Sequence, residues 1–536
     1  MSEQTGETTQ KRLRILADDE IEAIYSRPHF TPEERGQFFA LAPLEKELLQ
    51  AFRSVHSQSY FILQLGYFKA KQLFFTFAYP EVIADLQYIL TAHFPQVQLT
   101  ALSDVNRRTN LRQRRLILEL CHYRLCGDQE RQQLQTKARQ AAKISSKPIY
   151  VLRELLQYLA EQRIVTPGYS FLQDTVGQAL TYEQERLITL VQMHLNEAEH
   201  KALKSLLDDT PGLYQLTLLK REPKDFTLRE IKQEISRGAQ IHPLYQLAQR
   251  VLPQWDISQE SIKYYASLVT YYTIFRLKQL AEPTAALYLL CFIQHRYQRL
   301  HDNLLNSLIH HVRRYMDEVK NAAKEQVYAY QRENNENLQK AGRVLQLFTN
   351  DNIEQNTPFQ TVQLQAFAIL ERQKLAHIAE QIASNASFDE TAFQWEHVTK
   401  LASQFKRHLR PILLAVAFAA PGSNDPLLAA IQFWQAVLRK EKMLTTATLA
   451  TCPTQFIPAN LKRYLYAPEP GGRKRLLLER YEFLLYRVLR QGLEAGEIFC
   501  RDSVRFRSFE DDLINEQHWR QKEELLATTG LTLLKQ

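Results

Sequence analysis

Residues 148–180 read PIYVLRELLQYLAEQRIVTPGYSFLQDTVGQAL, two amphipathic segments separated by Thr166-Pro167-Gly168. Pro148 suits the first position of a helix, where its missing N–H is not needed for a helical hydrogen bond. The side chains that recur at helical spacing are Leu152, Leu155, Leu156 and Leu159 in the first segment and Phe171, Leu172, Thr175, Val176 and Leu180 in the second. The stretch therefore predicts two helices joined by a turn, as in a helix-turn-helix module.

The polar residues at the start of the second predicted helix are the candidates for reading bases. In helix-turn-helix proteins, the N-terminal residues of the second helix lie at base edges in the major groove. Tyr169, Ser170 and Gln173 occupy such positions. Two helices and a turn also occur in ordinary helical bundles, so this pattern indicates DNA binding only together with a second feature.

The second feature is a basic region immediately upstream. Residues 101–150 hold eleven Lys or Arg against four Asp or Glu, a net charge of +7, while the whole chain carries +8. The candidates for phosphate contact are Arg107, Arg108, Arg112, Arg114, Arg115, Lys137, Arg139, Lys143 and Lys147. A single basic cluster is usually a solvated helix face. Two such clusters in succession favour contact with the DNA backbone, which depends on salt and not on base sequence.

Length and composition indicate a large helical protein. The chain has 536 residues, which suggests about three domains. It has only 15 glycines, so long segments run without a helix breaker. We expect an all-α, multi-domain protein with a DNA-binding domain over residues 10–207, a second DNA-binding or spine domain over 208–345, and a linker or dimerisation region over 359–536.

Capping and breaker residues predict several boundaries inside these domains. Thr31-Pro32-Glu33-Glu34 has the form of a capping box with Pro at the first helical position. We further predict a helix over 57–75 with core aromatics, a helix over 182–207, a break at Gly238 before a helix starting at Pro243, nearly continuous helix over 261–340, and a helix over 473–493. The run from Arg107 to Arg115 is expected to lead into a helix, and both basic clusters lie in the first predicted domain.

The sequence carries no sign of a membrane or secreted protein. Its longest apolar runs, 283–293 and 411–420, are far shorter than the roughly 20 residues that cross a bilayer. Residues 1–12 are polar and lack the apolar region of a signal peptide. Five scattered cysteines fit reduced thiols, and Cys121 and Cys126 have no second pair to complete a zinc site. We expect a cytoplasmic protein without metal or cofactor.

Motifs for catalysis are also lacking in the sequence. It contains no P-loop, no GxGxxG and no GxSxG. Glu510, Asp511 and Asp512 are consecutive, so on a helix they point in different directions and do not form a paired metal site. From its own residues, the chain is not expected to be an enzyme.

Six stretches spread over almost the whole chain carry a resemblance to a known family. They are FTPEER at 30–35, FILQLGYFKAK at 61–71, QRIVTPGY at 162–169, HRY at 295–297, DNL at 302–304 and CRDSVRFRSF at 500–509. Together they resemble the N-terminal half of bacterial replicative transposases of the Tn-three family. The resemblance implies binding to the terminal inverted repeats of a transposon and assembly into a dimeric complex. In that family an acidic-triad, RNase H-like domain further along the chain cuts and joins the strands.

Taken together, these features predict sequence-specific binding of double-stranded DNA at transposon ends. Because the sequence stops at Gln536, about where the family continues toward its catalytic domain, we expect a truncated or split transposase without that domain. It would act as a homodimer or pair with a catalytic half. The alternative is a helical assembly or regulatory protein that pairs with a full-length transposase through residues 261–340, and a decayed gene product without a role is a third.

Overall fold

The computed structural model describes residues 13–97, 105–210, 213–351, 353–354, 356–384, 388–422, 424–440, 451–469 and 474–509. In these residues helices dominate and strands form only two-stranded antiparallel pairs, so the predicted all-α class is confirmed. Contacts group the chain into two units, Met1–Leu216 with Leu244–His295, and Thr217–Pro243 with Arg296–Gln536. Helices α12 (Leu228–Val251) and α15 (Glu282–Leu347) run through the boundary. The three-domain division stays a prediction.

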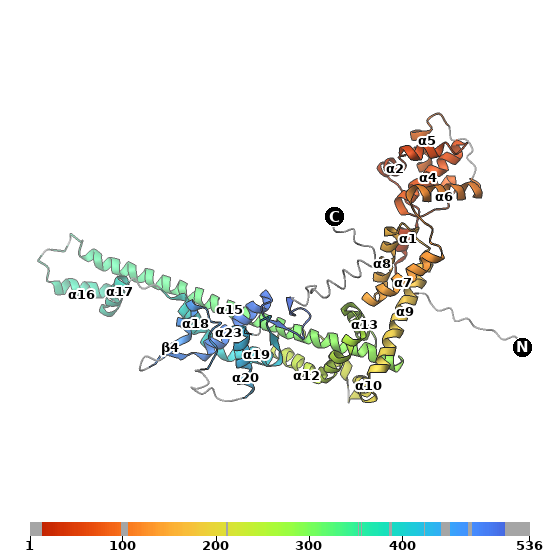
Figure 1. Ribbon diagram of the computed structural model, residues 1–536. Coiled ribbons are helices and arrows are strands. Elements are labelled where there is room, and N and C mark those ends of the chain that lie inside the picture. The colour runs from red at the N-terminus through yellow and green to blue at the C-terminus, as the bar shows by residue number, and fades with distance from the viewer. Residues whose placement is uncertain are drawn as a thin grey trace. The chain divides into compact units, whose positions relative to one another are not determined.

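The first unit begins with a helical core built around α4 (Val55–Lys71), which contacts α2, α5 and α6 (Figure 1). The neighbouring elements are α2 (Pro32–Phe38), α3 (Pro43–Leu49), the 3-10 turn η1 (Tyr79–Val82), α5 (Ile83–His93) and α6 (Arg107–Cys121). Phe61, Leu65 and Phe68 of α4 are buried, so the prediction of core aromatics is confirmed. The predicted capping box also forms, because Thr31 Oγ1 accepts from the Glu34 N–H and Glu34 Oε2 accepts from the Thr31 N–H.

A bundle of α7 (Asp128–Ile144), α8 (Pro148–Glu161) and α9 (Tyr169–His194) follows, with α1 (Asp18–Tyr25) against it. Its buried residues include Leu152, Leu155, Leu159, Leu172 and Val176, so the two predicted helices and their core faces are confirmed. The α8–α9 connection, residues 162–168, is longer than the three or four residues typical of a helix-turn-helix turn.

The α8–α9 connection joins this bundle to the α4 core. The backbone of Arg124, just beyond α6, donates to Arg163 O at 2.9 Å and accepts from the Val165 N–H at 2.8 Å. Ile164 is buried in the α7–α9 core, whereas Val165 is buried in the α4 core. Adjacent side chains of this extended segment therefore enter two different cores.

Four predicted boundaries are wrong. Helix α9 continues through Tyr182, where a new helix was expected, to His194, because it contains no Pro and its single Gly, Gly177, does not interrupt it. Helix α12 continues through Gly238 and Pro243, so packing outweighs the intrinsic cost of these residues, about 1 kcal/mol for Gly and 3 kcal/mol for Pro. The helix expected from residue 473 begins at Leu478, because residues just before it pair as a strand.

The rest of the first unit consists of short elements and the N-terminal part of α15. The predicted helical stretch 261–340 consists of α13 (Gln259–Tyr271), α14 (Ile274–Lys278) and the long α15. The other elements are α10 (Glu197–Lys204), η2 (Ser205–Leu207), the strand pair β1 (Asp209–Thr210) and β2 (Leu213–Tyr214), and η3 (Leu252–Trp255), while α11 (Gln215–Leu219) lies at the boundary between the units.

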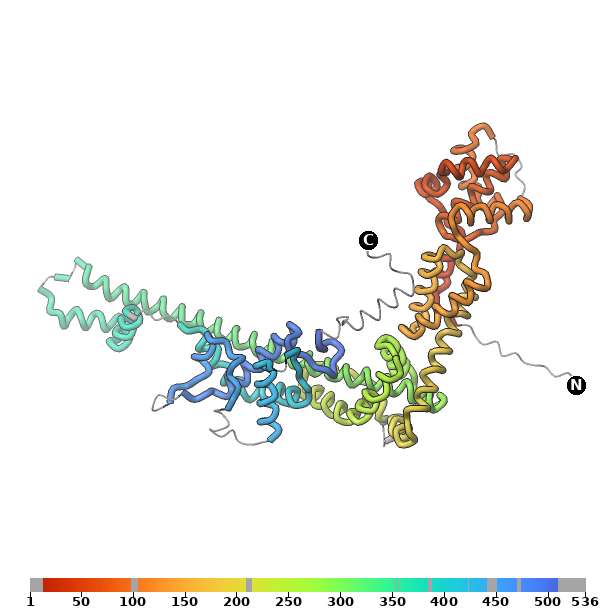
Figure 2. Tube along the Cα trace, viewed as in Figure 1, coloured from red at the N-terminus to blue at the C-terminus, as the bar shows by residue number. Residues whose placement is uncertain are grey.

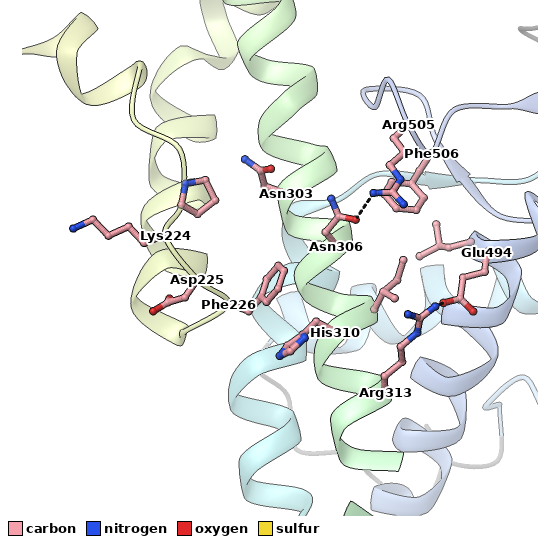
Figure 3. A pocket seen from close by; sticks show the side chains of 13 residues that line it. Lys224, Asp225, Phe226, Asn303, Asn306, His310, Arg313, Glu494, Arg505 and Phe506 are labelled. Carbon is pink, nitrogen blue, oxygen red and sulfur yellow. Dashed lines mark hydrogen bonds and ion pairs between the residues drawn. The ribbon is translucent and has the colours of Figure 1, made fainter. Parts of the chain in front are cut away.

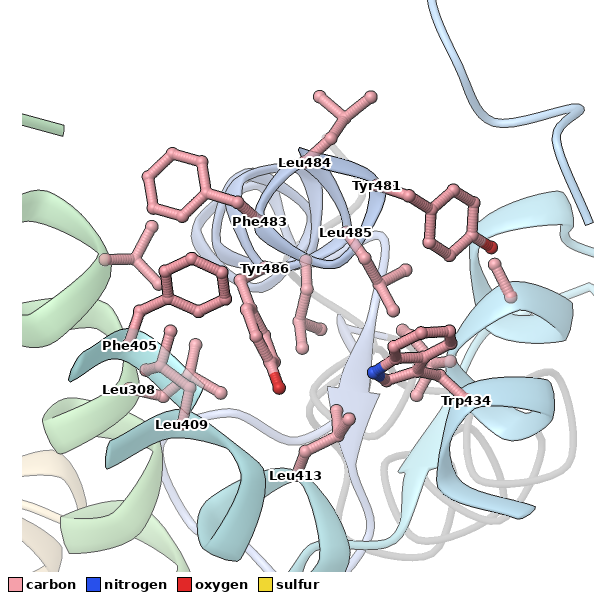
Figure 4. Close-up of a cluster of buried hydrophobic side chains, with 14 of the residues drawn as sticks. Leu308, Phe405, Leu409, Leu413, Trp434, Tyr481, Phe483, Leu484, Leu485 and Tyr486 are labelled. Carbon is pink, nitrogen blue, oxygen red and sulfur yellow. The ribbon is translucent and has the colours of Figure 1, made fainter. Parts of the chain in front are cut away.

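The core of the second unit lies where the middle of α15 meets α18 (Glu390–Lys400), α19 (Ala402–Ala415), α20 (Pro426–Arg439) and α23 (Leu478–Ala495). Phe405, Trp434 and Tyr486 pack there (Figure 4). Glu482 is buried in the same core, where Arg410 donates to both its carboxylate oxygens at 2.7 and 2.8 Å. This bidentate pairing holds the Glu482 carboxylate in an otherwise apolar environment.

A buried arginine fastens α15 to the start of α12. Arg296 is 3% exposed, and its Nε donates to Leu219 O at 2.6 Å. Its Nη2 donates to Arg221 O at 2.7 Å and to Glu234 Oε1 at 3.1 Å. Arg296, the middle residue of the HRY stretch, is therefore a structural residue, and its positive charge is neutralised inside the protein.

The remaining elements of the second unit extend from this core. Helices α16 (Phe359–Ile369) and α17 (Arg372–Ser384) return beside the C-terminal end of α15 (Figures 1 and 2) and share a small cluster with it through Val344, Ala366, Leu370 and Ile378. The shorter elements are β3 (Phe418–Ala419), which pairs with β6 (Phe499–Cys500), η4 (Ala459–Leu461), α22 (Lys462–Leu465), and β4 (Tyr466–Pro468), which pairs with β5 (Lys474–Leu476).

Candidate nucleic-acid interface

Helix α6 carries the first cluster of predicted phosphate-binding residues. Asn106 caps the helix, because its Oδ1 accepts from the Thr109 N–H at 2.8 Å. One side of α6 packs on the α4 core through Ile117, and Gln113 Nε2 donates to Ser57 O at 2.8 Å. These contacts fix which side of the helix is exposed.

The exposed side of α6 presents four arginines, Arg107, Arg108, Arg112 and Arg115, which we call the arginine face. At 100° per residue they span about 140° of the helix circumference, and together with Leu111 they line a surface hollow. None of the four forms an ion pair with any residue that the structure describes. Arg112 lies over the Phe52 ring, with 5.8 Å from its guanidinium carbon to the ring centroid. The aromatic contact of Arg112 therefore holds one edge of the arginine face, and no carboxylate of the described residues neutralises its positive charge.

Arg114 is separate from this face. Its guanidinium lies over the Phe74 ring at 5.2 Å, and Nη2 is 3.5 Å from Phe75 O. Burial lowers the pKa of Arg114. The structure therefore places this predicted phosphate ligand against the α4 core.

The second basic cluster is largely neutralised within the first unit. Lys137 Nζ lies 3.6 Å from Glu154 Oε2, and Lys147 Nζ lies 3.2 Å from Glu260 Oε2. Lys143 pairs with Asp256. Arg139 stacks over the Tyr182 ring at 4.4 Å. The two clusters therefore differ in their ion pairs: the arginine face forms none with the described residues, whereas the three lysines of the second cluster each pair with a carboxylate.

The predicted base-reading residues lie at the start of α9, beneath the N-terminal segment. Tyr169 Oη accepts from the Leu16 N–H at 3.1 Å, and Gln173 Nε2 donates to Leu13 O at 2.8 Å. Tyr25 Oη donates to Pro167 O at 2.9 Å, so α1 also covers this end of α9. Ser170 is exposed. Two of the three predicted residues therefore hold another part of the chain.

One exposed arginine at this surface, Arg53, was not among the predicted site residues. Arg53 follows Phe52, the ring beneath Arg112, and it is exposed without an ion pair to any described residue. No local pattern marks it, because residue 53 is isolated from the basic clusters in the sequence. Only the packing of α6 against the start of α4 brings its segment to this face.

The described part of the chain contains no group of three or more His, Cys, Asp or Glu arranged to hold a metal ion. No helix in it combines the length and the apolar character needed to cross a membrane. Residues 510–512, the consecutive acids of the sequence analysis, lie outside the described residues.

Comparison with known proteins shows what this part of the sequence is similar to. Residues 15–179, which include α6 and the start of α9, match a family described as a domain of unknown function, DUF4158. In an alignment of 403 residues that covers 70% of this chain, the sequence is 22% identical to the transposase for transposon Tn1546 from Enterococcus faecium. The chain is related to a transposase. It spans 37% of the length of that relative.

Proposed function

We propose that this protein binds double-stranded DNA through the arginine face and that its target is the terminal inverted repeat of a transposon. The observation that carries the proposal is the set of four arginines on one exposed side of α6, none paired with a carboxylate of the described residues. Each guanidinium that binds a phosphate releases counterions, which favours association. The positive end of the α6 dipole, next to Arg107 and Arg108, adds to this attraction. The relationship to a transposase supports a transposon end as the target.

Base recognition is proposed at the start of α9. Ser170 is exposed there and is free to contact a base edge. Contact by Tyr169 and Gln173 requires the segment around Leu13 and Leu16 to leave α9, because both side chains bind its backbone. Lys137, Arg139, Lys143 and Lys147 are assigned a secondary part, because bound phosphate would have to displace their present carboxylate or aromatic partners.

We further propose that the chain corresponds to the N-terminal, DNA-binding half of a Tn-three family replicative transposase. The six stretches that resemble this family support the assignment. The described residues form only two-stranded sheets, which suits DNA recognition better than strand cleavage on an RNase H-like sheet. In this role the protein works as a homodimer or together with a catalytic half.

A second candidate function, pairing with a transposase chain, is favoured by one observation. The C-terminal third of α15 exposes large apolar side chains, with Tyr328 71%, Leu338 41% and Leu345 68% exposed. Exposed apolar side chains along one helix are typical of an assembly surface. Pairing through this segment does not need the arginine face, so the two functions respond to different substitutions.

The test is a binding titration over a series of salt concentrations. The triple variant Arg108→Gln, Arg112→Gln, Arg115→Gln is compared with the original protein on a duplex that carries the transposon end. The slope of log K against log salt is negative, and removing three phosphate contacts should make it less steep by about 2.7, since each contact contributes about 0.9. The original protein should bind the transposon end at least about 10³-fold more tightly than a scrambled duplex.

A variant with the same change in net charge provides the control. Lys46, Arg153 and Lys201 are exposed and form no ion pair with described residues, so their replacement by Gln should leave the salt slope nearly unchanged. Equal slopes for the two triple variants would overturn the arginine face as the binding surface. Equal affinity for the transposon end and the scrambled duplex would overturn end recognition and favour the pairing function.

A further inference from the structure

The second unit contains a pocket of about 800 Å³ between α15, the loop before α12 and the loop after β6 (Figure 3), which we call the α15 pocket. Its size is in the range of small-molecule and cofactor sites. Two of the stretches that resemble the transposase family, residues 302–304 and 500–509, meet at its wall, although they lie about 200 residues apart. The proposed role of the arginine face makes no use of this pocket.

One wall of the α15 pocket is a loop that presents Arg505. Asp302 Oδ1 accepts from the backbone N–H of Val504 at 3.2 Å and of Arg505 at 3.1 Å, and also from Ser503 Oγ. Ser503 Oγ in turn accepts from the Phe506 N–H at 2.7 Å. The loop backbone is thus fixed by a single carboxylate of α15 and a single hydroxyl.

The guanidinium of Arg505 is held but is not neutralised. Its Nη1 donates to Asn306 Oδ1 at 3.3 Å, and its guanidinium carbon lies 5.4 Å from the centroid of the Phe506 ring. It forms no ion pair with any residue in the described ranges. Arg313, also at the pocket, differs because Glu494 binds it at 2.5 Å. Arg505 therefore offers an anion a guanidinium in a defined position.

The opposite wall presents an aromatic ring. Phe226 is 38% exposed and stacks on His310, with ring centroids 4.4 Å apart and an interplanar angle of 24°. Its backbone is fixed, because Phe226 O accepts a hydrogen bond from His311 Nε2 at 2.7 Å. Figure 3 shows the Phe226 ring turned toward the same space as Asn306. Because the backbone of Phe226 is fixed and its ring is partly exposed, a second planar group can stack on the ring.

An aromatic platform and an amide suit the face and the edge of a nucleotide base, and a free guanidinium suits its phosphate. Bases stack on aromatic rings whatever their identity, and Arg binds phosphate through its planar fork. Because Asn306 Oδ1 is engaged by Arg505, its amide NH₂ remains as a donor toward a base edge. We propose that the α15 pocket binds one unstacked nucleotide, with the base on Phe226 and the phosphate at Arg505. The nucleotide belongs either to a DNA strand with an extruded base or to a free mononucleotide.

The experiment uses the full chain and two DNA duplexes that differ by a single bulged 2-aminopurine. The bulged duplex should bind more tightly than the perfect one, by roughly 5- to 100-fold for one stacked base. Its fluorescence should also fall on binding, as the base stacks on Phe226. Phe226→Ala and Arg505→Gln should each abolish most of this preference, and Phe226→Tyr should retain it.

Three controls separate the possible causes. Arg501→Gln changes an exposed arginine of the same loop outside the pocket and should keep the preference for the bulge. The arginine-face triple variant should lose overall affinity yet keep the bulge preference, so a failure of one proposal does not imply failure of the other. Competition by dAMP assigns the pocket to free nucleotides, and its absence assigns the pocket to a strand. Equal binding of the two duplexes, or a preference that survives in a folded Phe226→Ala protein, overturns the proposal.

Discussion

Replacing Arg296 by Met should destabilise the second unit by about 3 kcal/mol. The guanidinium is buried and binds Leu219 O, Arg221 O and the Glu234 carboxylate, all on the segment before and within α12. Met preserves most of the apolar stem of the side chain, so the change removes the charge and its hydrogen bonds with little loss of packing. The substitution therefore tests the fastening of α15 to α12.

The magnitude follows from the groups left behind. Each carbonyl oxygen that loses its donor while buried costs about 1–3 kcal/mol. Glu234 does not lose all compensation, because Arg237 Nη1 remains 2.5 Å from its Oε1. That second partner keeps the loss near the lower end of the about 3–5 kcal/mol typical when a buried ion pair is broken.

The assay is hydrogen exchange under increasing urea, followed on peptides from residues 217–243. A chain with two units need not unfold in one step, so a single unfolding midpoint would mix both. Arg299→Met is the matched control, since Arg299 lies one helical turn away with a side chain 56% exposed and an Nε 3.5 Å from Glu222. It should cost less than about 1 kcal/mol. Equal loss of protection in the two variants would refute the reasoning.

Two further predictions concern a close contact and a buried histidine. Gly66→Ala should destabilise the first unit by about 1–3 kcal/mol in urea unfolding, because the new Cβ would lie 2.4 Å from a Phe39 ring carbon. Gly177→Ala, in an open helical position, should instead stabilise it by about 0.5–1 kcal/mol, and a loss there would contradict the argument. Burial, with a smaller effect from His408, lowers the pKa of His311 from 6.5 to about 4. The second unit should therefore lose about 2 kcal/mol of stability between pH 7 and pH 5, and a His311→Gln variant that loses as much would count against this origin.

Local signals in the sequence were sufficient for much of the fold. The capping box at Thr31 and the Pro148 helix start depend on residues within one helical turn, and both are present as predicted. The uninterrupted course of α12 through Pro243 could not be read in this way. It depends on tertiary packing, which outweighs the intrinsic cost of Pro in a helix.

The candidate interface was less predictable, because it depends on which charges are already satisfied. Arg112 and Lys147 look alike in the sequence, yet Lys147 meets Glu260, more than 100 residues away, and Arg112 meets no carboxylate among the described residues. Likewise, the covering of Tyr169 and Gln173 by residues 13–16 joins segments more than 150 residues apart. Spacing along a chain does not reveal such partners.

Because Ile164 and Val165 are buried in two different cores, the number of residues in the α8–α9 connection is constrained. Inserting one residue ahead of Ile164 would turn each side chain to the opposite side, so that each would face the wrong core. The backbone bonds of Arg124 to the same segment would lose their register as well. Loops usually tolerate insertion, but these few residues should tolerate none. Changes in the packing of the α4 core and of the α7–α9 bundle are therefore expected to be coupled through this connection.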